Sequence, residues 1–178
     1  MEEKLILVDE NDNVIGTSNK LEVHQKGLLH RAFSILIFNT KGELLIQKRA
    51  VEKYHSKGLW SNTCCSHPIE GENEQNTINK KLKQEMGIVT EVQFAYHFIY
   101  KIELDNGLIE NELDKVYIGE YEGEIKANPL EVSDFKWIGL ELLRKEMASR
   151  PRDYTHWFKI IVNEHLEDFN FASSNSKF

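Results

Sequence analysis

The pattern of apolar and polar residues predicts strands and helices that alternate along the chain. Residues 4–8 and 14–18 flank a turn-rich DENDN segment and predict a hairpin. Residues 30–38 (HRAFSILIF) are aromatic and β-branched, and the NTKG segment that follows turns the chain back into ELLIQKR at 43–49. We expect these two runs to form a second, well-buried hairpin.

Residues 72–86 predict a helix. Apolar side chains recur every fourth residue from Ile78 to Met86, and Glu85 borders this stripe. Acidic residues crowd the first turn and lysines the later turns, which suits the helix dipole. Gly87 is placed to cap the end of the helix.

The second half of the chain continues the alternation. Strand-like runs lie at 93–104, 108–112, 115–121 and 132–138, and helical patterns lie at 139–148 and 154–166. The DNG segment at 105–107 predicts a tight turn between the first two strands. The tail, about 167–178, ends in small polar residues, so we expect it to be frayed. Without a linker or a repeat, these elements predict a single α/β domain over residues 1–178.

Composition and charge exclude several classes of partner. The formal net charge of −7 argues against general nucleic-acid binding, because such binding needs a broad basic surface. No apolar run approaches the roughly 20 residues that span a bilayer. The acidic N-terminus resembles neither a secretory signal nor a transit peptide. We therefore expect a cytoplasmic protein that binds neither nucleic acid nor membrane; monomer and homodimer both remain open.

The two cysteines, Cys64 and Cys65, are adjacent in the sequence. A disulfide between neighbours would be strained, so we expect free thiols in a reducing compartment. Cys65 and His67 are two residues apart, so an extended segment places this thiol beside the imidazole. A cation bound by His67 would lower the pKa of Cys65 and make it reactive. The alternative is a small buried side chain, which is the role that we expect for Cys64.

Histidines and carboxylates are spaced so that they can meet at one site. His24, His30 and His67 lie beside turns or strand ends, where side chains can converge. Glu110 and Glu112 are two residues apart, so an extended strand points both carboxylates to the same face. Three imidazoles and two carboxylates suit Zn, Mn or Fe better than Mg or Ca. The alternatives are isolated structural histidines and a solvated acidic strand edge.

A local basic cluster surrounds the QKRAVEK stretch and the loop before it. Its members are Lys20, Lys48, Arg49 and Lys53. Such a cluster in an acidic protein is suited to the capture of a phosphate or diphosphate. The alternative is that these side chains only increase solubility.

Together these segments resemble the type 1 isopentenyl-diphosphate isomerases, which are enzymes of the Nudix fold. The resemblance rests on KLEVHQKGLLHRAFS, KRA with a later lysine, GLWSNTCCSHP, a helix that ends in QEMG, and ENEL. It runs from about Lys4 to Leu166. Its TxCxHP and ENE motifs occur in the same order, and at a similar separation along the sequence, as in that family. It implies a mixed β-sheet sandwiched between helices. It also implies an enzyme of isoprenoid biosynthesis that converts isopentenyl diphosphate into dimethylallyl diphosphate.

The resemblance further implies two metal ions. The ligands of a tightly bound Mn²⁺ or Zn²⁺ would be His24, His30, His67, Glu110 and Glu112. Glu85 would hold a Mg²⁺ that arrives with the substrate diphosphate.

The same resemblance implies how the substrate is held. The residues that would bind the diphosphate are Lys20, Arg49 and Lys53. Lys81 stands where the family often has an arginine near the diphosphate, so the charge is kept but the bidentate fork is lost. Trp157 would line the hydrocarbon end of the pocket, and Trp60 would shape the same pocket.

Shifting an unactivated double bond through a tertiary carbocation requires an acid and a base that removes another proton. The resemblance makes Cys65 and Glu112 the catalytic pair, with Tyr100 assisting Glu112. We favour Glu112 and Tyr100 as the proton donor and Cys65 as the acceptor. A dry pocket would keep water from the cation, and the Trp157 ring can stabilise it by roughly 2 kcal/mol or more.

Two other functions share some of these features. A Nudix hydrolase would carry the pattern G-x5-E-x7-R-E-U-x-E-E-x-G, with metal-binding glutamates on a helix. The residues at its specified positions here include Ser66, Glu72, Lys80, Lys81, Gln84 and Glu85. The opening glycine and two of the three glutamates near the helix end are thus missing. A metal-stabilised binding domain without turnover is the second alternative, which the presence of Cys65, Glu112 and Tyr100 disfavours.

Overall fold

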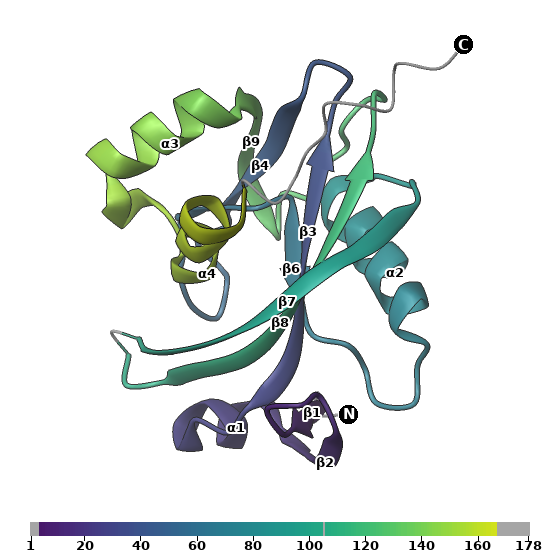
Figure 1. The fold of residues 1–178 in the computed structure, drawn as a ribbon, viewed down its shortest axis with the longest axis vertical. Coiled ribbons are helices and arrows are strands. Elements are labelled where there is room, and N and C mark those ends of the chain that lie inside the picture. Colours follow the sequence, from purple (N-terminus) through teal and green to yellow (C-terminus); the bar gives the residue numbers. More distant parts are fainter. Residues whose placement is uncertain (1–3, 105, 167–178) are drawn as a thin grey trace.

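The computed structural model describes residues 4–104 and 106–166 of the chain (Figure 1). Within these ranges the strands are β1 (Lys4–Val8), β2 (Val14–Asn19), β3 (His30–Phe38), β4 (Glu43–Arg49), β5 (Trp60–Ser61), β6 (Cys64–Ser66), β7 (Val92–Glu103), β8 (Ile109–Glu120) and β9 (Val132–Gly139). The helices are α1 (Lys20–Lys26), α2 (Glu74–Met86), α3 (Leu140–Ser149) and α4 (His156–Ile160), with a 3-10 turn at Pro151–Asp153 and a π-helical turn at Ile161–His165. The predicted tail at 167–178 and Asp105 of the predicted turn lie outside the described residues.

The sheet is mixed and centres on two neighbouring strands, β3 and β8. These strands run parallel in a register that sets His30 opposite Glu112. β7 is antiparallel to β8, β6 is antiparallel to β3, and β4 is antiparallel to both β5 and β9. The second predicted hairpin is present as β3 and β4, which pair at Phe38 and Leu44. Along its whole length β4 also pairs with β9.

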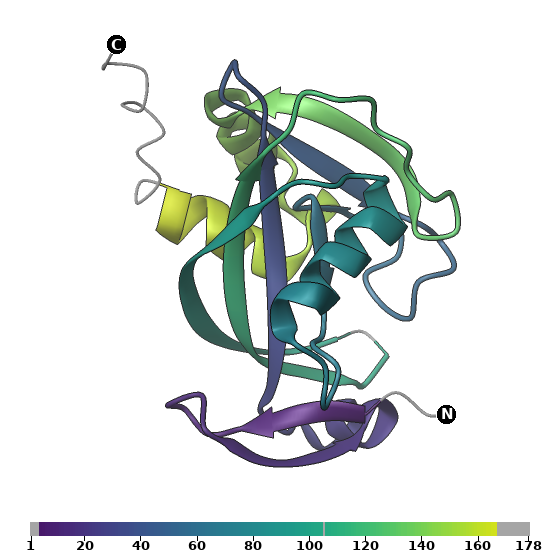
Figure 2. The same cartoon turned by 90° about the vertical axis from the view of Figure 1, so that its right-hand side faces the viewer.

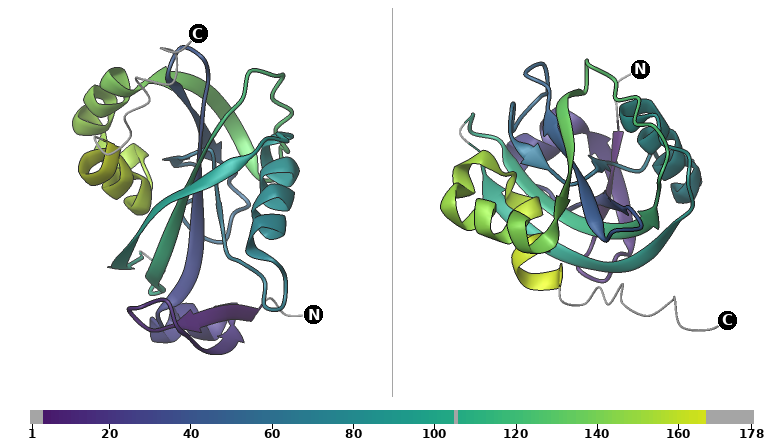
Figure 3. Two further views of the ribbon diagram at one scale, coloured as in Figure 1. Left: turned by 45° about the vertical axis from the view of Figure 1, so that its right-hand side comes forward. Right: turned by 90° about the horizontal axis from the view of Figure 1, so that it is seen from above.

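Helices cover both faces of the sheet (Figures 1 and 3). On one face, the apolar stripe of α2 packs in a core with Ile35 and Ile37 of β3. On the other face, α3 and α4 pack in a core with Leu36 and Phe38. Successive residues of a strand point to opposite faces, so this arrangement buries the whole apolar run of β3. The predicted α/β fold, with a mixed sheet sandwiched between helices, is confirmed.

The N-terminal hairpin and α1 lie at one end of the sheet, at the bottom of Figure 2. Asp12, in the turn of this hairpin, pairs with Lys115 of β8 at 2.9 Å. Helix α1 ends at Gly27, whose φ of 61° is left-handed. A Cβ at this position would lie 2.8 Å from the side chain of Ile109, so only glycine lets α1 approach β8 this closely.

Two regions differ from the predicted elements. Residues 20–26 form helix α1, where we had predicted no helix or strand. The side chain of Asn19 caps this helix by accepting a hydrogen bond from the backbone N–H of Glu22. The predicted strands at 108–112 and 115–121 are one strand, β8, because Asp114 between them is buried in the sheet instead of turning the chain.

The remaining predicted elements are present with small changes of boundary. The predictions for β1, β2, β7, β9 and α3 agree with the structure to within one residue at each end. Helix α2 begins after Asn73, which caps it, and ends at Gly87 with a left-handed φ of 69°, as predicted. The helix predicted at 154–166 is α4 followed by the π-helical turn. No helix in the described part of the chain has the length and apolar character that crossing a bilayer requires.

Candidate active site

Adjacent strands gather acidic side chains on one buried face. Glu110, Glu112 and Asp114 alternate along β8, so their side chains point to the same face of the sheet. His30 on β3 and Tyr100 on β7 both lie opposite Glu112. All five side chains are buried. The two-residue spacing of the glutamates brings both carboxylates within 4.0 Å of the same imidazole, that of His30.

The backbone fixes the orientation of two histidine rings. Nδ1 of His24 lies 2.7 Å from the carbonyl oxygen four residues earlier, and Nδ1 of His30 lies 2.9 Å from the carbonyl oxygen two residues earlier. A carbonyl oxygen only accepts, so Nδ1 carries the proton and Nε2 keeps its lone pair. Nε2 of His24 lies 3.4 Å from Glu110, and Nε2 of His30 lies 3.5 Å from Glu112. Both lone pairs are therefore directed into one cluster.

Four atoms of this cluster are buried without a hydrogen-bond partner among the described residues. They are Nε2 of His24, Nε2 of His30 and both carboxylate oxygens of Glu110. The ligand atoms of His24, His30 and His67 lie within 4.8 Å of one another, as do those of His30, Glu110 and Glu112. Buried lone pairs without donors are costly, and one cation would satisfy them together. The donor set therefore fits a divalent metal ion.

Glu112 connects this cluster to a cavity. Tyr100 donates its hydroxyl hydrogen to one oxygen of Glu112 over 2.6 Å, and Nε2 of His67 lies 3.0 Å from the other oxygen. Burial opposes ionisation, but the neighbouring imidazoles of His30 and His67 hold the pKa of Glu112 well below its usual range. The contacts of the chain itself therefore keep this carboxylate ionised at neutral pH.

Cys65 faces the cavity from β6, where it pairs with Ser34 of β3. Its sulfur lies 3.6 Å from Nη1 of Arg49. Burial raises the pKa of the Cys65 thiol to about 12, although the charge of Arg49 acts in the opposite direction. The predicted lowering of this pKa is thus not produced by the protein's own groups. Cys64 packs in the core beside α2, as predicted.

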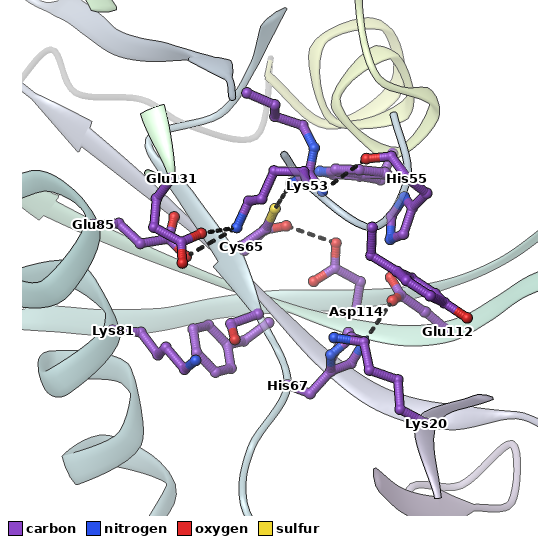
Figure 4. Close-up of a pocket in the computed structure, with 17 residues that line it drawn as sticks. Lys20, Lys53, His55, Cys65, His67, Lys81, Glu85, Glu112, Asp114 and Glu131 are labelled. Atoms are coloured by element: carbon purple, nitrogen blue, oxygen red, sulfur yellow. Dashed lines mark hydrogen bonds and ion pairs between the residues drawn. The ribbon is translucent and has the colours of Figure 1, made fainter. Parts of the chain in front are cut away.

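The cavity has a volume of about 220 Å³ and carries a basic wall (Figure 4). The predicted diphosphate-binding residues that line it are Lys20, Arg49, Lys53 and Lys81. Lys53 forms ion pairs with Glu85, at 3.7 Å, and with Glu131. Gln47 donates a hydrogen bond to Glu85 over 3.2 Å. We call Lys20, Arg49, Lys53 and Lys81 together the basic wall; carboxylates balance part of its charge.

The two predicted tryptophans occupy different places. Trp157 lines the cavity, and the Arg49 guanidinium lies 5.5 Å from the centroid of its ring. Trp60 is not among the described residues that line the cavity; its ring faces Lys136 at 5.0 Å and packs on the core. Trp60 pairs with Lys48 across β5 and β4, so both side chains share one side of the sheet and neither reaches the cavity. The expected role of Trp60 in shaping the pocket stays a prediction.

The structure adds residues that sequence reasoning missed. His55, in the loop after β4, places Nε2 2.9 Å from Oε1 of Glu110, within the range of an ion pair although this contact does not have the geometry of a hydrogen bond. Asp114 lines the cavity and accepts a hydrogen bond of 2.8 Å from the hydroxyl of Ser34, while burial and the charge of Glu112 raise the pKa of Asp114 well above its usual value. Continuing the alternation of β8 by one step would have found Asp114. No spacing in the sequence points to His55.

Comparison with known proteins identifies the family of this chain. The NUDIX domain family model matches residues 28–158. Isopentenyl-diphosphate Delta-isomerase 2 of Photorhabdus laumondii is 50% identical over 163 residues, which cover 92% of each chain. Isopentenyl-diphosphate Delta-isomerase 1 of Aromatoleum aromaticum is 47% identical over the same share of each chain. The chain belongs to the Nudix family of isopentenyl-diphosphate Delta-isomerases.

The fold of this Nudix isomerase family is also found in a protein with little sequence identity. The crystal structure of DR0079 from Deinococcus radiodurans matches with a TM-score of 0.68 at 18% identity, over 83% of this chain and 90% of that one. This likeness concerns the fold alone. Membership of the Nudix isomerase family and the buried histidine and glutamate cluster together indicate that the chain binds a divalent metal ion.

Proposed function

We propose that this protein isomerises isopentenyl diphosphate to dimethylallyl diphosphate. One observation carries the proposal: Cys65 and Glu112, two groups able to exchange protons, line the same cavity as a wall of cations suited to a diphosphate. The names of the Photorhabdus and Aromatoleum relatives support the same activity. The cavity, about 220 Å³, lies below the roughly 300–1,000 Å³ of drug-sized pockets, which suits a small substrate.

The diphosphate would bind at the basic wall. The residues that would contact it are Lys20, Arg49, Lys53 and Lys81. Because Lys53 already pairs with Glu85 and Glu131, the diphosphate would replace these carboxylates as the partner of its ammonium group. Glu85 would then be available to hold the Mg²⁺ that accompanies the diphosphate.

The buried cluster would hold the tightly bound Mn²⁺ or Zn²⁺. Its ligands would be His24, His30, His67, Glu110 and Glu112. The buried atoms of His24, His30 and Glu110 that have no hydrogen-bond partner among the described residues fit such an ion. When bound, the ion supplies a fixed positive charge beside Glu112. The backbone carbonyls behind His24 and His30 would hold the two rings in the tautomer that ligation requires.

Cys65 and Glu112 would carry the two protons of the reaction. One proton adds to the terminal CH₂ carbon of the alkene, and another leaves the CH₂ group on the far side of the tertiary carbon. We assign donation to the hydrogen-bonded pair of Tyr100 and Glu112, in which the Tyr100 hydroxyl supplies the proton and the Glu112 carboxylate relays it to the alkene, and we assign removal to the thiolate of Cys65. This direction requires the thiolate, which burial of Cys65 disfavours and the Arg49 guanidinium, 3.6 Å from the sulfur, favours. The stereochemistry of deuterium incorporation in Cys65 and Glu112 variants tests this assignment. A proton added from the side of Cys65 and removed on the side of Glu112 would contradict it.

The helix α2 disfavours hydrolysis of the diphosphate. Nudix hydrolases activate water with several glutamates on this helix, and here Lys81 and Gln84 stand at two of those positions. Glu85 remains, and it is buried against Gln47 and Lys53. This leaves one carboxylate at the helix end for an accompanying ion.

The test compares two neighbouring cysteines. Purified protein is incubated with isopentenyl diphosphate, Mg²⁺, and Mn²⁺ or Zn²⁺, and dimethylallyl diphosphate and released phosphate are followed together. We expect isomer without phosphate, a loss of about 10²–10⁴-fold in rate for Cys65→Ala, and retained activity for Cys64→Ala, whose side chain lies in the core. Phosphate without isomer would identify a hydrolase, and neither product would identify a binding domain without turnover.

A further inference from the structure

A fourth imidazole lies beside the metal cluster, on the side of the cavity. His55 belongs to the loop at 50–59 between β4 and β5, which also carries Lys53 of the basic wall. Its side chain is only 11% exposed, and its Nε2 lies 2.9 Å from Oε1 of Glu110. Figure 4 shows the ring at the edge of the cavity, on the opposite side from Lys81 and α2. His55 therefore contacts both the cavity and a predicted metal ligand.

The ring of His55 is held on several sides. It lies between the ring of His24, at a centroid distance of 6.2 Å, and the ring of Trp157, at 6.0 Å and nearly perpendicular. Nδ1 lies 3.2 Å from the hydroxyl of Ser56. With the ring in this position, Nε2 faces Oε1 of Glu110.

The backbone of the loop is held in a conformation that L-residues rarely adopt. Ser56, directly after His55, has a φ of +51°. The carbonyl oxygen of His55 accepts a hydrogen bond of 3.1 Å from Nη2 of Arg49. An unusual backbone conformation persists where its surroundings fix it, and such positions cluster at functional sites. Here it lies directly beside His55, and His55, Arg49 and Lys53 all line the cavity.

The position of His55 distinguishes it from a metal ligand. The groups of mutually close ligand atoms contain His24, His30, His67, Glu110 and Glu112, and His55 is in neither group. Its close partner is Oε1 of Glu110, which otherwise lies 3.4 Å from His24. A residue that contacts a metal ligand from outside the ligand set acts by orienting that ligand.

We infer that His55 is a positioning residue that holds Glu110 towards the metal ion and thereby fixes the loop of the basic wall to the metal centre. This inference rests on the metal centre of the proposed function. Binding of the ion and ordering of the loop are then coupled, and each favours the other. A substrate diphosphate would meet Lys53 and Arg49 already in place.

The experiment measures metal affinity and loop order on the full chain. Dissociation constants for Mn²⁺ and Zn²⁺ are measured by competition with a chromophoric chelator for the wild type, His55→Ala and His55→Gln. His97→Ala is the matched control, because His97 is exposed on β7. Hydrogen exchange of peptides covering residues 50–59 is followed with and without Mn²⁺, and circular dichroism checks that each variant is folded.

We expect His55→Ala to weaken metal binding about 10–100-fold and to abolish the slowing of exchange that the ion causes in the loop. His55→Gln, whose amide nitrogen lies near the place of Nε2, should keep most of the affinity, and His97→Ala all of it. Unchanged affinity in His55→Ala would overturn the inference. An equal loss in His55→Ala and His55→Gln would also overturn it, because such a loss indicates direct ligation.

These outcomes are separate from those of the proposed function. If the wild type binds Mn²⁺ or Zn²⁺ and His55→Ala weakens that binding, but the wild type forms no dimethylallyl diphosphate, the proposed activity fails and the inference stands. If the wild type isomerises its substrate and His55→Ala binds the ion as tightly, the activity stands and the inference fails.

Discussion

The metal cluster and the basic wall both bury ionisable side chains, but the chain satisfies them in different ways. In the metal cluster, Nε2 of His24, Nε2 of His30 and both oxygens of Glu110 have no hydrogen-bond partner among the described residues. In the basic wall, Lys53 is already paired with Glu85 and Glu131. The metal cluster can therefore bind a cation directly. In the basic wall, Lys53 has to release its carboxylate partners before it can bind an anion.

The two regions also differ in the elements that carry them. The carboxylates of the metal cluster stand on β8, in register with β3, and two of its histidines have rings fixed by backbone carbonyls. Arg49 and Lys53 of the basic wall stand at the end of β4 and in the loop after it. A rigid strand framework suits a permanent ligand, and a loop suits a substrate that enters and leaves.

Removing the metal ion should have the largest effect on stability. A ligand present at 100 times its dissociation constant stabilises the folded state by about 2.7 kcal/mol, which for a chain of this size corresponds to roughly 5–10 °C in Tm. We therefore expect a strong chelator to lower the Tm of Mn²⁺- or Zn²⁺-loaded protein by this amount. Calorimetry before and after chelation measures it, with return of the ion as the control.

We also expect that adding Mg²⁺ after chelation does not restore the Tm of the metal-loaded protein. Three imidazoles suit Mn²⁺ or Zn²⁺ and suit Mg²⁺ poorly. A Tm that does not change on chelation of metal-loaded protein would show that the cluster is stable by itself, and the contrast with the basic wall would then be lost.

Lys53→Met should affect the substrate and leave the metal cluster unchanged. Hydrogen bonds to charged groups contribute about 1.5–3 kcal/mol, so we expect KM for isopentenyl diphosphate to rise roughly 10–100-fold. Lys57→Met is the matched control, because Lys57 is exposed in the same loop. Steady-state kinetics and metal content are measured together. Loss of the tightly bound ion in Lys53→Met would contradict the separation of the two regions.

Local periodicity predicted the parts of the site that lie on strands. The two-residue spacing of Glu110 and Glu112 depends on strand geometry alone, so their common face could be predicted without the fold. The stripe of α2 likewise predicted its buried face and its cap at Gly87. The same reasoning failed at Asp114, because a buried aspartate in mid-strand has the composition of a turn.

The parts that could not be predicted depend on contacts between distant segments. His55 meets Glu110 across 55 positions of the chain, and no short-range pattern encodes that contact. The surroundings of Trp60 could not be predicted either: it lies opposite Lys48 across β5 and β4, and its ring faces Lys136 of β9. Helix α1 was missed because it is only seven residues long, too short for its periodicity to be distinctive.

The smallest predicted effect concerns the single point charge that α2 contributes to the basic wall. Lys81 lines the cavity from this helix, and an arginine there would offer a planar fork that can make two parallel hydrogen bonds to a diphosphate. One additional hydrogen bond contributes about 0.5–1.5 kcal/mol, so we expect Lys81→Arg to lower KM about two- to tenfold with little change in kcat. Lys80→Arg, on the exposed side of the same helix, controls for the general effect of arginine. An unchanged or higher KM in Lys81→Arg would mean that the helix side of the wall acts only through its charge, and that the diphosphate is gripped from the loop side alone.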